Sequence, residues 1–315
     1  MIILLVCCQI SSAKDLYTVG GANSSSSDEI DLNTIQFSYI SNRREQFWPY
    51  VESADSEWDW GINLYRYYGQ ATGTDFTGHH LEGVFGWHYS DKSYFRGTIG
   101  IHRLDVPSLD NQKDQKTYDL HAQFGITRNF YLLVNASEDY VYQLGLQPAA
   151  AREFLNAERW EAGFEWKPIE SIRVSSTSSI WNLSDSNTRR ENIARLLYGI
   201  SPGWPWIWIG VSYEELEYDI VKSGYWTPAS FRSVGLIFES SFPVSENLSG
   251  ALSASLTNIK EDNNPEGNGG SITVGVDYKL TEIHTLRFEF NRILSSQQNS
   301  DWTENTYSLL LNGSF

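Results

Sequence analysis

The sequence has little cysteine, methionine or proline, and it has no long hydrophobic run. Its 315 residues contain two cysteines, Cys7 and Cys8, one methionine and nine prolines. Because both cysteines lie near the N-terminus, a disulfide framework and a cysteine-based metal site are excluded for the rest of the chain. Although 41% of the residues are hydrophobic, no run approaches the ~20 consecutive apolar residues that a transmembrane helix needs. A membrane-crossing helix is therefore excluded.

Positive charge and histidine are also scarce. The chain has 23 basic and 39 acidic side chains, for a formal net charge of −16. Such a balance repels phosphate backbones, so nucleic acid is not an expected partner. Of the six histidines, His79 and His80 are adjacent and would point to opposite faces of a strand, whereas His88, His102 and His121 would lie on separate strands. We interpret the last three as polar lining, and we predict no catalytic residue, no metal site and no cofactor.

The N-terminal segment predicts export. Residues 1–13 contain a short apolar run followed by Ser11, Ser12 and Ala13, small residues that are typical of a signal-peptide cleavage site. We therefore expect a signal peptide over residues 1–13 and a single mature domain over residues 14–315.

Aromatic residues are abundant, and the apolar residues alternate with polar ones. The aromatic share is 14%, with 12 Trp and 18 Tyr, which favours β-strands and membrane interfaces. At the C-terminus, Tyr307, Leu309, Leu311 and Phe315 share one face of a predicted strand, and largely polar residues occupy the other face. A chain that stops on Phe after such alternation resembles the C-terminal strand of bacterial outer-membrane proteins.

The same period of two recurs upstream, for example over 118–126, 160–167, 272–280 and 286–291. Counting such segments from Leu16 onward predicts about sixteen strands, and bacterial single-chain barrels have an even number. The fold class is therefore all-β, a transmembrane antiparallel β-barrel in a bacterial outer membrane. Aromatic girdles are expected at Trp58, Trp60, Trp87, Tyr89, Trp204, Trp206 and Trp208. Because alternation alone does not distinguish a membrane barrel from a soluble one, a secreted glycan-binding β-protein stays an alternative.

The connections between predicted strands alternate in length. Short links, at 126–129, 167–171 and 280–283, are expected at the periplasmic end, and longer ones, at 104–116, 138–158, 258–269 and 294–302, outside. The connection over Phe47–Ser56 is longer than a periplasmic turn should be. The stretch Pro148–Leu155 predicts a short helix, either exposed in an outer loop or folded into the pore, and we favour the exposed position.

The polar faces of the strands carry both signs of charge, which predicts a wet, mixed lumen. Charged rings of this kind tune the selectivity of channels, although opposite charges can also pair and stiffen the wall. The candidate pore-lining residues are Asp59, Glu82, Arg96, Asp119, His121, Glu161, Glu165, Arg195, Arg232, Asp277, Arg287 and Glu289.

One short segment resembles a known family. Gly224, Tyr225, Trp226, Thr227 and Pro228 are similar to the Gly-Tyr-aromatic-Ser-Pro segment in the C-terminal porin domains of cellulose and poly-N-acetylglucosamine export proteins, with Thr in place of the usual Ser. The resemblance implies an exopolysaccharide as the transported partner, with the rings of Tyr225 and Trp226 stacking on sugars. Those exporters carry a helical-repeat scaffold before the barrel, for which this chain has no room, so a separate periplasmic delivery protein is an expected partner.

Beside the secreted glycan-binding protein, three membrane functions remain open from the sequence. The leading hypothesis is a non-enzymatic outer-membrane pore that exports an exopolysaccharide and contacts outer-membrane lipid. The second is a general or solute-specific diffusion porin of the same architecture. The third is a barrel enzyme that acts on lipid, which would need a Ser and a His close together near the rim; no Gly-x-Ser-x-Gly motif is present.

Overall fold

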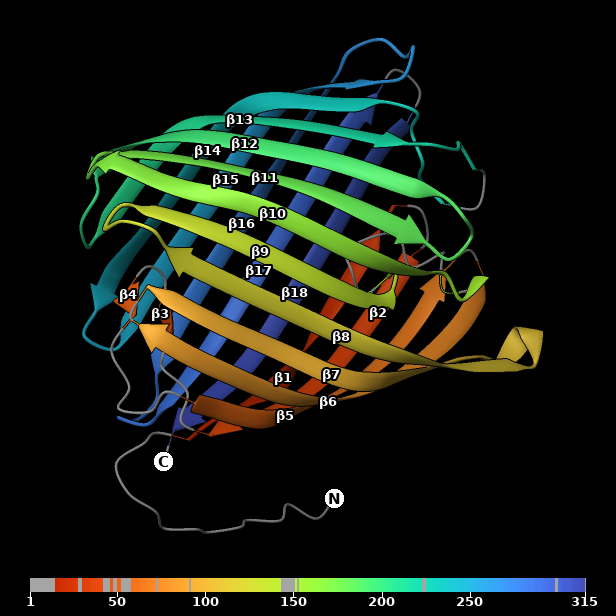
Figure 1. Ribbon diagram of the computed structural model, residues 1–315, viewed down its shortest axis with the longest axis horizontal. Helices are drawn as coiled ribbons and strands as arrows, with labels where there is room; N and C mark the ends of the chain where they lie inside the picture. The colour runs from red at the N-terminus through yellow and green to blue at the C-terminus, as the bar shows by residue number, and fades with distance from the viewer. Residues whose placement is uncertain are drawn as a thin grey trace.

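The chain folds into one closed antiparallel β-barrel of sixteen strands (Figure 1). The computed structural model describes residues 15–27, 30–41, 46–47, 50–51, 58–71, 73–90, 92–142, 151, 153–222, 225–297 and 300–314. The predicted signal peptide, residue Phe315 and most of the Phe47–Ser56 connection lie outside the described residues. The predicted fold class and strand number are confirmed.

The barrel strands follow one another around the wall in sequence order. They are β1 (Leu16–Ser26), β2 (Ile30–Ser41), β5 (Trp58–Ala71), β6 (Thr74–Ser90), β7 (Ser93–Val106), β8 (Asn111–Gly125), β9 (Phe130–Tyr140), β10 (Asn156–Ile169), β11 (Ile172–Leu183), β12 (Thr188–Ser201), β13 (Trp206–Tyr218), β14 (Phe231–Ser245), β15 (Leu248–Glu261), β16 (Gly267–Lys279), β17 (His284–Gln297) and β18 (Ser300–Ser314). Two short strands, β3 (Gln46–Phe47) and β4 (Tyr50–Val51), pair with each other between β2 and β5, and a 3-10 turn spans Pro107–Leu109.

The barrel wall has a largely apolar outward face and a largely polar inward face. On β5, Trp58, Trp60 and Leu64 are exposed, whereas the intervening Asp59 and Asn63 are buried. The same outward aliphatic belt continues around the wall, because successive strand residues point to opposite faces. An exposed apolar exterior around a polar interior is the inverse of a soluble barrel and is what a bilayer requires. The chain is therefore a β-barrel of the bacterial outer membrane.

The first and last strands close the barrel, with Leu16 opposite Ser314. The start of β1 and the end of β18 consequently lie at one end of the barrel, which the short links 126–129, 170–171 and 280–283 share. These short turns identify that end as periplasmic. The opposite end, here called the outer mouth, carries longer connections, but all four that were predicted there are shorter than predicted, because the flanking strands extend into them. For example, β15 continues to Glu261 and β17 to Gln297, because their hydrogen-bonded pairing extends beyond the apolar belt.

The aromatic girdle at the periplasmic end is only partly as predicted. Trp58 and Trp87 lie on the outer face and stack with ring centroids 5.9 Å apart, beside the exposed Tyr89. Trp206 and Trp208 are instead buried and point inward. The prediction of both as girdle residues is wrong because they alternate with outward Ile207 and Ile209.

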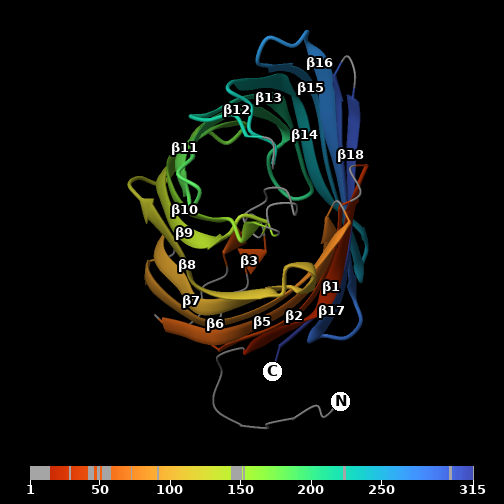
Figure 2. The same cartoon turned by 90° about the vertical axis from the view of Figure 1, so that its right-hand side faces the viewer.

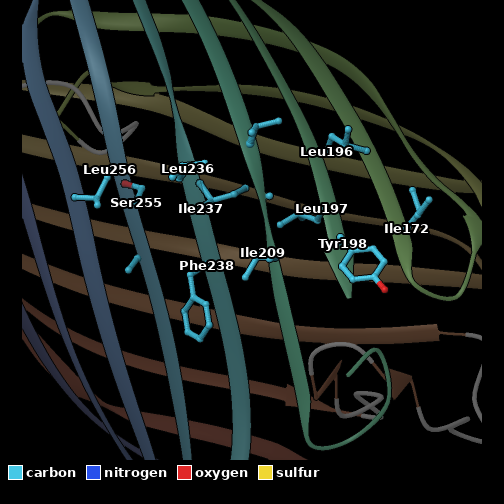
Figure 3. A pocket seen from close by; sticks show the side chains of 13 residues that line it. Ile172, Leu196, Leu197, Tyr198, Ile209, Leu236, Ile237, Phe238, Ser255 and Leu256 are labelled. Atoms are coloured by element: carbon cyan, nitrogen blue, oxygen red, sulfur yellow. The ribbon is translucent and has the colours of Figure 1, made fainter. Parts of the chain in front are cut away.

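The outward face of β11 to β15 is hollowed. Figure 3 shows that aliphatic side chains from these strands, including Leu196, Leu236 and Leu256, line this hollow. All three are more than half exposed, which places the hollow in the lipid-facing belt.

Among the described residues, no helix is long and apolar enough to cross a membrane.

Two outer loops fold back into the barrel, and Figure 2 shows the yellow-green segment after β9 inside the ring of strands. In this segment Ala151, Phe154 and Leu155 are buried, so the exposed position favoured for Pro148–Leu155 is wrong for the part that the structure describes. Ala151 and Phe154 pack on inward residues of β5, β6, β7 and β9. The sequence could not predict this inward position, because the apolar residues of a loop do not follow the alternation that fixes where a strand residue points.

Candidate functional site: the lumen and its outer mouth

The periplasmic half of the lumen holds a buried charge cluster around Asp59 of β5. The Asp59 carboxylate is 2% exposed, and its Oδ2 lies 3.0 Å from both His88 Nε2 and Arg96 Nη2. β6 and β7 are the next two strands along the wall, so alternation alone brings these three inward side chains together. Asp59 and Arg96 thus lie on the inward face, as predicted.

The wall next to this cluster is a network of neutral and acidic hydrogen-bonding groups. Glu82 accepts hydrogen bonds from Asn63 Nδ2 and Thr98 Oγ1, both at 3.0 Å. His121 Nε2 lies 3.0 Å from the Tyr94 hydroxyl, and its other ring nitrogen contacts Asn135. These groups form a hydrated, hydrogen-bonding surface rather than a set of isolated charges.

Several predicted lining residues occur as ion pairs. Arg287 forms a bidentate ion pair with Asp277, with N···O distances of 2.7 and 2.8 Å. Lys167 Nζ lies 3.0 Å from Glu165 Oε1, and Arg159 contacts Glu161. Three further members of the predicted set are exposed and also point inward. Each shares a strand face with an inward residue: Asp119 with His121, Arg195 with Glu191, and Glu289 with Arg287. The lumen therefore carries both signs of charge. Several of these charges pair with one another, which is the alternative that the sequence left open.

Arg232 differs from the rest of the predicted set because it lies on the outward face. On β14 it precedes Val234 and Leu236 on the same side, and these are 53% and 64% exposed. Its guanidinium pairs with Glu215 of β13 at 3.0 Å, at the outer-mouth edge of the belt. The prediction assigned it to the lumen from its charge, but charged residues are also common on the outer face beyond the bilayer.

The predicted sugar-stacking pair is used to pack the loop between β13 and β14. Tyr225 is 6% exposed and belongs to an apolar cluster with inward Trp181, Leu216 and Tyr218. Trp226 packs edge-on against Phe231 at 5.3 Å and donates from its indole nitrogen to Glu261 at 3.2 Å. The buried ring of Tyr225 cannot stack on a passing sugar in this conformation, contrary to the prediction.

A polar anchor fixes the same loop at the outer mouth. Asp185 accepts from the Tyr225 hydroxyl at 2.9 Å and from Lys222 Nζ at 2.6 Å. Burial alone would raise the pKa of Asp185, but the hydrogen bonds from Lys222 and Tyr225 outweigh it and lower that pKa below its ordinary value. Burial, together with the neighbouring Asp185 carboxylate, raises the pKa of Tyr225, so its hydroxyl stays a donor at neutral pH.

A buried tryptophan between two arginines also lines the mouth. The guanidinium carbons of Arg159 and Arg189 lie 4.9 and 4.5 Å from the ring centre of Trp181, within the range of cation–π attraction. Arg159 and Arg189 further pair with Glu161 and Glu191. Sequence reasoning missed Trp181, although its position between outward Ile180 and Asn182 was a usable signal.

The outer half of the lumen contains one histidine and aspartate cluster that the sequence did not group. His80 of β6 faces His102 of β7 in register, and Asp139 of β9 reaches both rings over the short side chain of Thr117. Only the register of β6 and β7 shows that the two histidines are neighbours. Asp139 comes from a strand that is not adjacent to either, so spacing in the sequence gave no signal.

The fold is similar to known outer-membrane barrels. A bacterial polysaccharide outer membrane secretin matches with a TM-score of 0.72 and 12% identity over 98% of this chain and 100% of that chain. CdiB from Acinetobacter baumannii matches with a TM-score of 0.52 at 8% identity, over 98% of this chain and 61% of that one. OpdQ from Pseudomonas aeruginosa matches at 9% identity and a TM-score of 0.48, over 97% and 100%. No protein-family model matches the sequence, and no curated protein matches it.

The polar interior and apolar exterior make the chain an outer-membrane β-barrel with a hydrophilic lumen. Its wall carries paired charges, amides and hydroxyls, and two inward loops narrow its outer mouth.

Proposed function

We propose that the barrel conducts an exopolysaccharide across the outer membrane without making or breaking a bond. The observation that carries the proposal is the hydrogen-bonding lumen, in which Asn, Thr, Tyr and carboxylate groups alternate with ion pairs. A sugar chain presents many hydroxyls, which exchange hydrogen bonds with such groups at little cost. The similarity of fold to a bacterial polysaccharide outer membrane secretin supports the same proposal.

Half-buried aromatic rings on the inward faces add a second kind of contact. Tyr94 of β7 is partly exposed on the lumen side, where its hydroxyl contacts His121. Tyr65 of β5 is likewise partly exposed and stacks on Tyr67 at 6.1 Å. Amphipathic rings of this type offer an apolar face to the C–H surface of a sugar while the hydroxyl remains hydrogen-bonded. These two tyrosines, rather than Tyr225, are the sugar-contacting candidates that the structure favours.

The test is current blocking in planar bilayers that contain the purified full chain. Soluble polysaccharide fragments should produce resolved blocks, and polyethylene glycol of the same size should produce shorter ones. Tyr94→Ala should shorten the polysaccharide blocks, whereas Tyr89→Ala, which removes a 77% exposed outward ring near the same end, should leave them unchanged. Equal blocks by both polymers, with no effect of Tyr94→Ala, would remove the support for a polysaccharide path.

A solute-specific diffusion porin is the second candidate, and the narrowed outer mouth favours it. Phe154 and Tyr225 belong to loops that pack on the inner wall, and such loops reduce the width of the outer mouth. Liposome swelling separates the two functions. Fast swelling in monosaccharides, together with no block by polysaccharide fragments, would favour the porin.

A further inference from the structure

Two histidines and one aspartate meet in the outer half of the lumen, on three strands. The imidazoles of His80 and His102 stack with centroids 4.6 Å apart. Asp139 places Oδ1 2.8 Å from His102 Nδ1 and Oδ2 3.7 Å from His80 Nδ1. The three side chains are 3%, 0% and 9% exposed, so solvent does not satisfy them.

The hydrogen bonds of His80 leave one ring nitrogen unexplained. Its Nε2 lies 2.8 Å from the Thr117 hydroxyl and 3.4 Å from Glu82 Oε1. Its Nδ1 is buried and has no hydrogen-bond partner among the described residues, although it faces the Asp139 carboxylate. When Nε2 donates to Thr117 or Glu82, Nδ1 carries a lone pair that faces the Asp139 carboxylate, which is unfavourable in a buried site, and such an orphaned atom requires an explanation. A cation between the two groups supplies one.

We propose that His80, His102 and Asp139 bind a divalent transition-metal ion of the zinc type. One ligand atom from each residue lies within 4.8 Å of the other two. A tetrahedral ion with bonds of about 2.1 Å holds its ligand atoms about 3.4 Å apart. Asp139 Oδ1 lies 2.8 Å from His102 Nδ1 and Asp139 Oδ2 lies 3.7 Å from His80 Nδ1, on either side of that value. Because the two rings are nearly parallel, with an interplanar angle of 11°, they must rotate for both Nδ1 lone pairs to point at one ion. Two imidazoles and one carboxylate favour zinc over magnesium or calcium, which prefer all-oxygen ligands.

The surroundings supply the outer contacts that metal-binding histidines require. In such sites the second ring nitrogen is held by a hydrogen-bonding partner, which fixes the ring. Here Thr117 and Glu82 hold His80 Nε2, and the Tyr142 hydroxyl lies 2.5 Å from His102 Nε2. Gly78 makes room for this contact, because a Cβ there would lie 2.6 Å from the Tyr142 oxygen and 3.0 Å from His102 Nε2.

The site connects the wall to the inward loop. Its ligands come from β6, β7 and β9, while Tyr142 belongs to the loop segment after β9 that packs in the same cluster as Phe154. Bound metal would therefore hold this loop in place at the outer mouth. The proposal does not depend on which solute crosses the pore.

The test is Zn²⁺ binding to the full chain, purified in detergent and stripped with a chelator. Calorimetry should show one Zn²⁺ per barrel, and X-ray absorption should show nitrogen and oxygen ligands with imidazole scattering. His80→Gln and Asp139→Asn should each abolish the stoichiometric binding. Tyr142→Phe should weaken it by roughly 10-fold to 100-fold, the usual cost of losing an outer contact.

His88→Gln is the matched control, because His88 is another buried inward histidine on the same strand as His80. It should retain wild-type affinity, and heat-modifiable mobility should show that every variant is a folded barrel. The proposal is overturned if the wild type binds no stoichiometric Zn²⁺, if folded His80→Gln and Asp139→Asn bind as tightly as the wild type, or if only His88→Gln loses the ion. If the variants do not fold, the X-ray absorption spectrum of the wild type decides, because a spectrum without imidazole scattering also overturns the proposal.

Discussion

Phe154 is the residue whose removal should most clearly open the outer mouth. Its ring is 7% exposed and packs among inward aromatic and aliphatic residues of the wall. Its backbone has a φ of 52°, a left-handed conformation that costs a non-glycine residue roughly 1 to 2 kcal/mol. The packing of the ring, together with the hydrogen bond from the Phe154 N–H to Ala151 O, opposes this cost.

Phe154→Ala removes the packing and retains the strained φ. Truncation of a buried Phe costs about 3 to 5 kcal/mol, and the lower value raises the population of the displaced loop by more than about 100-fold. Single-channel recording should then show a larger conductance, and limited proteolysis should show faster cleavage of the loop in intact vesicles. Phe154→Gly loses the same ring but accepts a positive φ without strain, so its effect should be smaller than that of Phe154→Ala.

Leu109→Ala is the matched control, because Leu109 is a 48% exposed apolar residue in another outer connection. It should leave both conductance and cleavage unchanged. The reasoning is refuted if Phe154→Ala conducts and is cleaved as the wild type is, since the ring would then not hold the loop inside the barrel.

Three further predictions address the two faces of the wall and the outer anchor. Leu236→Arg, on the lipid-facing side, should destabilise the barrel by about 2 to 4 kcal/mol in bilayer unfolding experiments, whereas Ser255→Arg on the inward face of the next strand should cost far less; equal costs would refute the assigned faces. Arg287→Gln should shift the reversal potential toward cation selectivity because it leaves Asp277 unpaired, while the outward Arg232→Gln should not shift it. Lys222 and Tyr225 lower the pKa of Asp185 below 3.8. The stabilisation that Asp185 gives the loop is therefore present above that pH and is lost as the pH falls through the lowered pKa. Proteolysis of the β13–β14 loop should therefore be constant from about pH 8 to 5 and rise only below about pH 4, and a rise near pH 6 would count against this anchor.

The architecture could be predicted because it depends on a local pattern. Alternation such as that of Trp58 and Asp59 fixes which face of a strand is apolar, and it repeats around the whole wall. The strand ends were less predictable, since β15 and β17 extend beyond the apolar belt on backbone hydrogen bonds that any residue can make. Residue type misled at Trp206 and Trp208, because tryptophan suggested an interface whereas alternation with Ile207 and Ile209 places both side chains inside.

The candidate site was less predictable, because its contacts join strands and loops that are distant in sequence. Alternation correctly placed Asp59 and Arg287 inward, but it could not show that Tyr225 is buried beneath its own loop. The meeting of His80 with Asp139 depends on the stagger of four strands and on the small side chain of Thr117 between them. No spacing in the sequence encodes that stagger.

Ion conductance of the purified barrel in a planar bilayer tests the central claim, that the chain forms an outer-membrane pore with a continuous polar path. The account predicts discrete current steps for the wild type and larger steps for Phe154→Ala, in folded protein verified by heat-modifiable mobility. If both folded proteins insert and neither carries current above the bare bilayer, the lumen is closed and the account of a pore is contradicted.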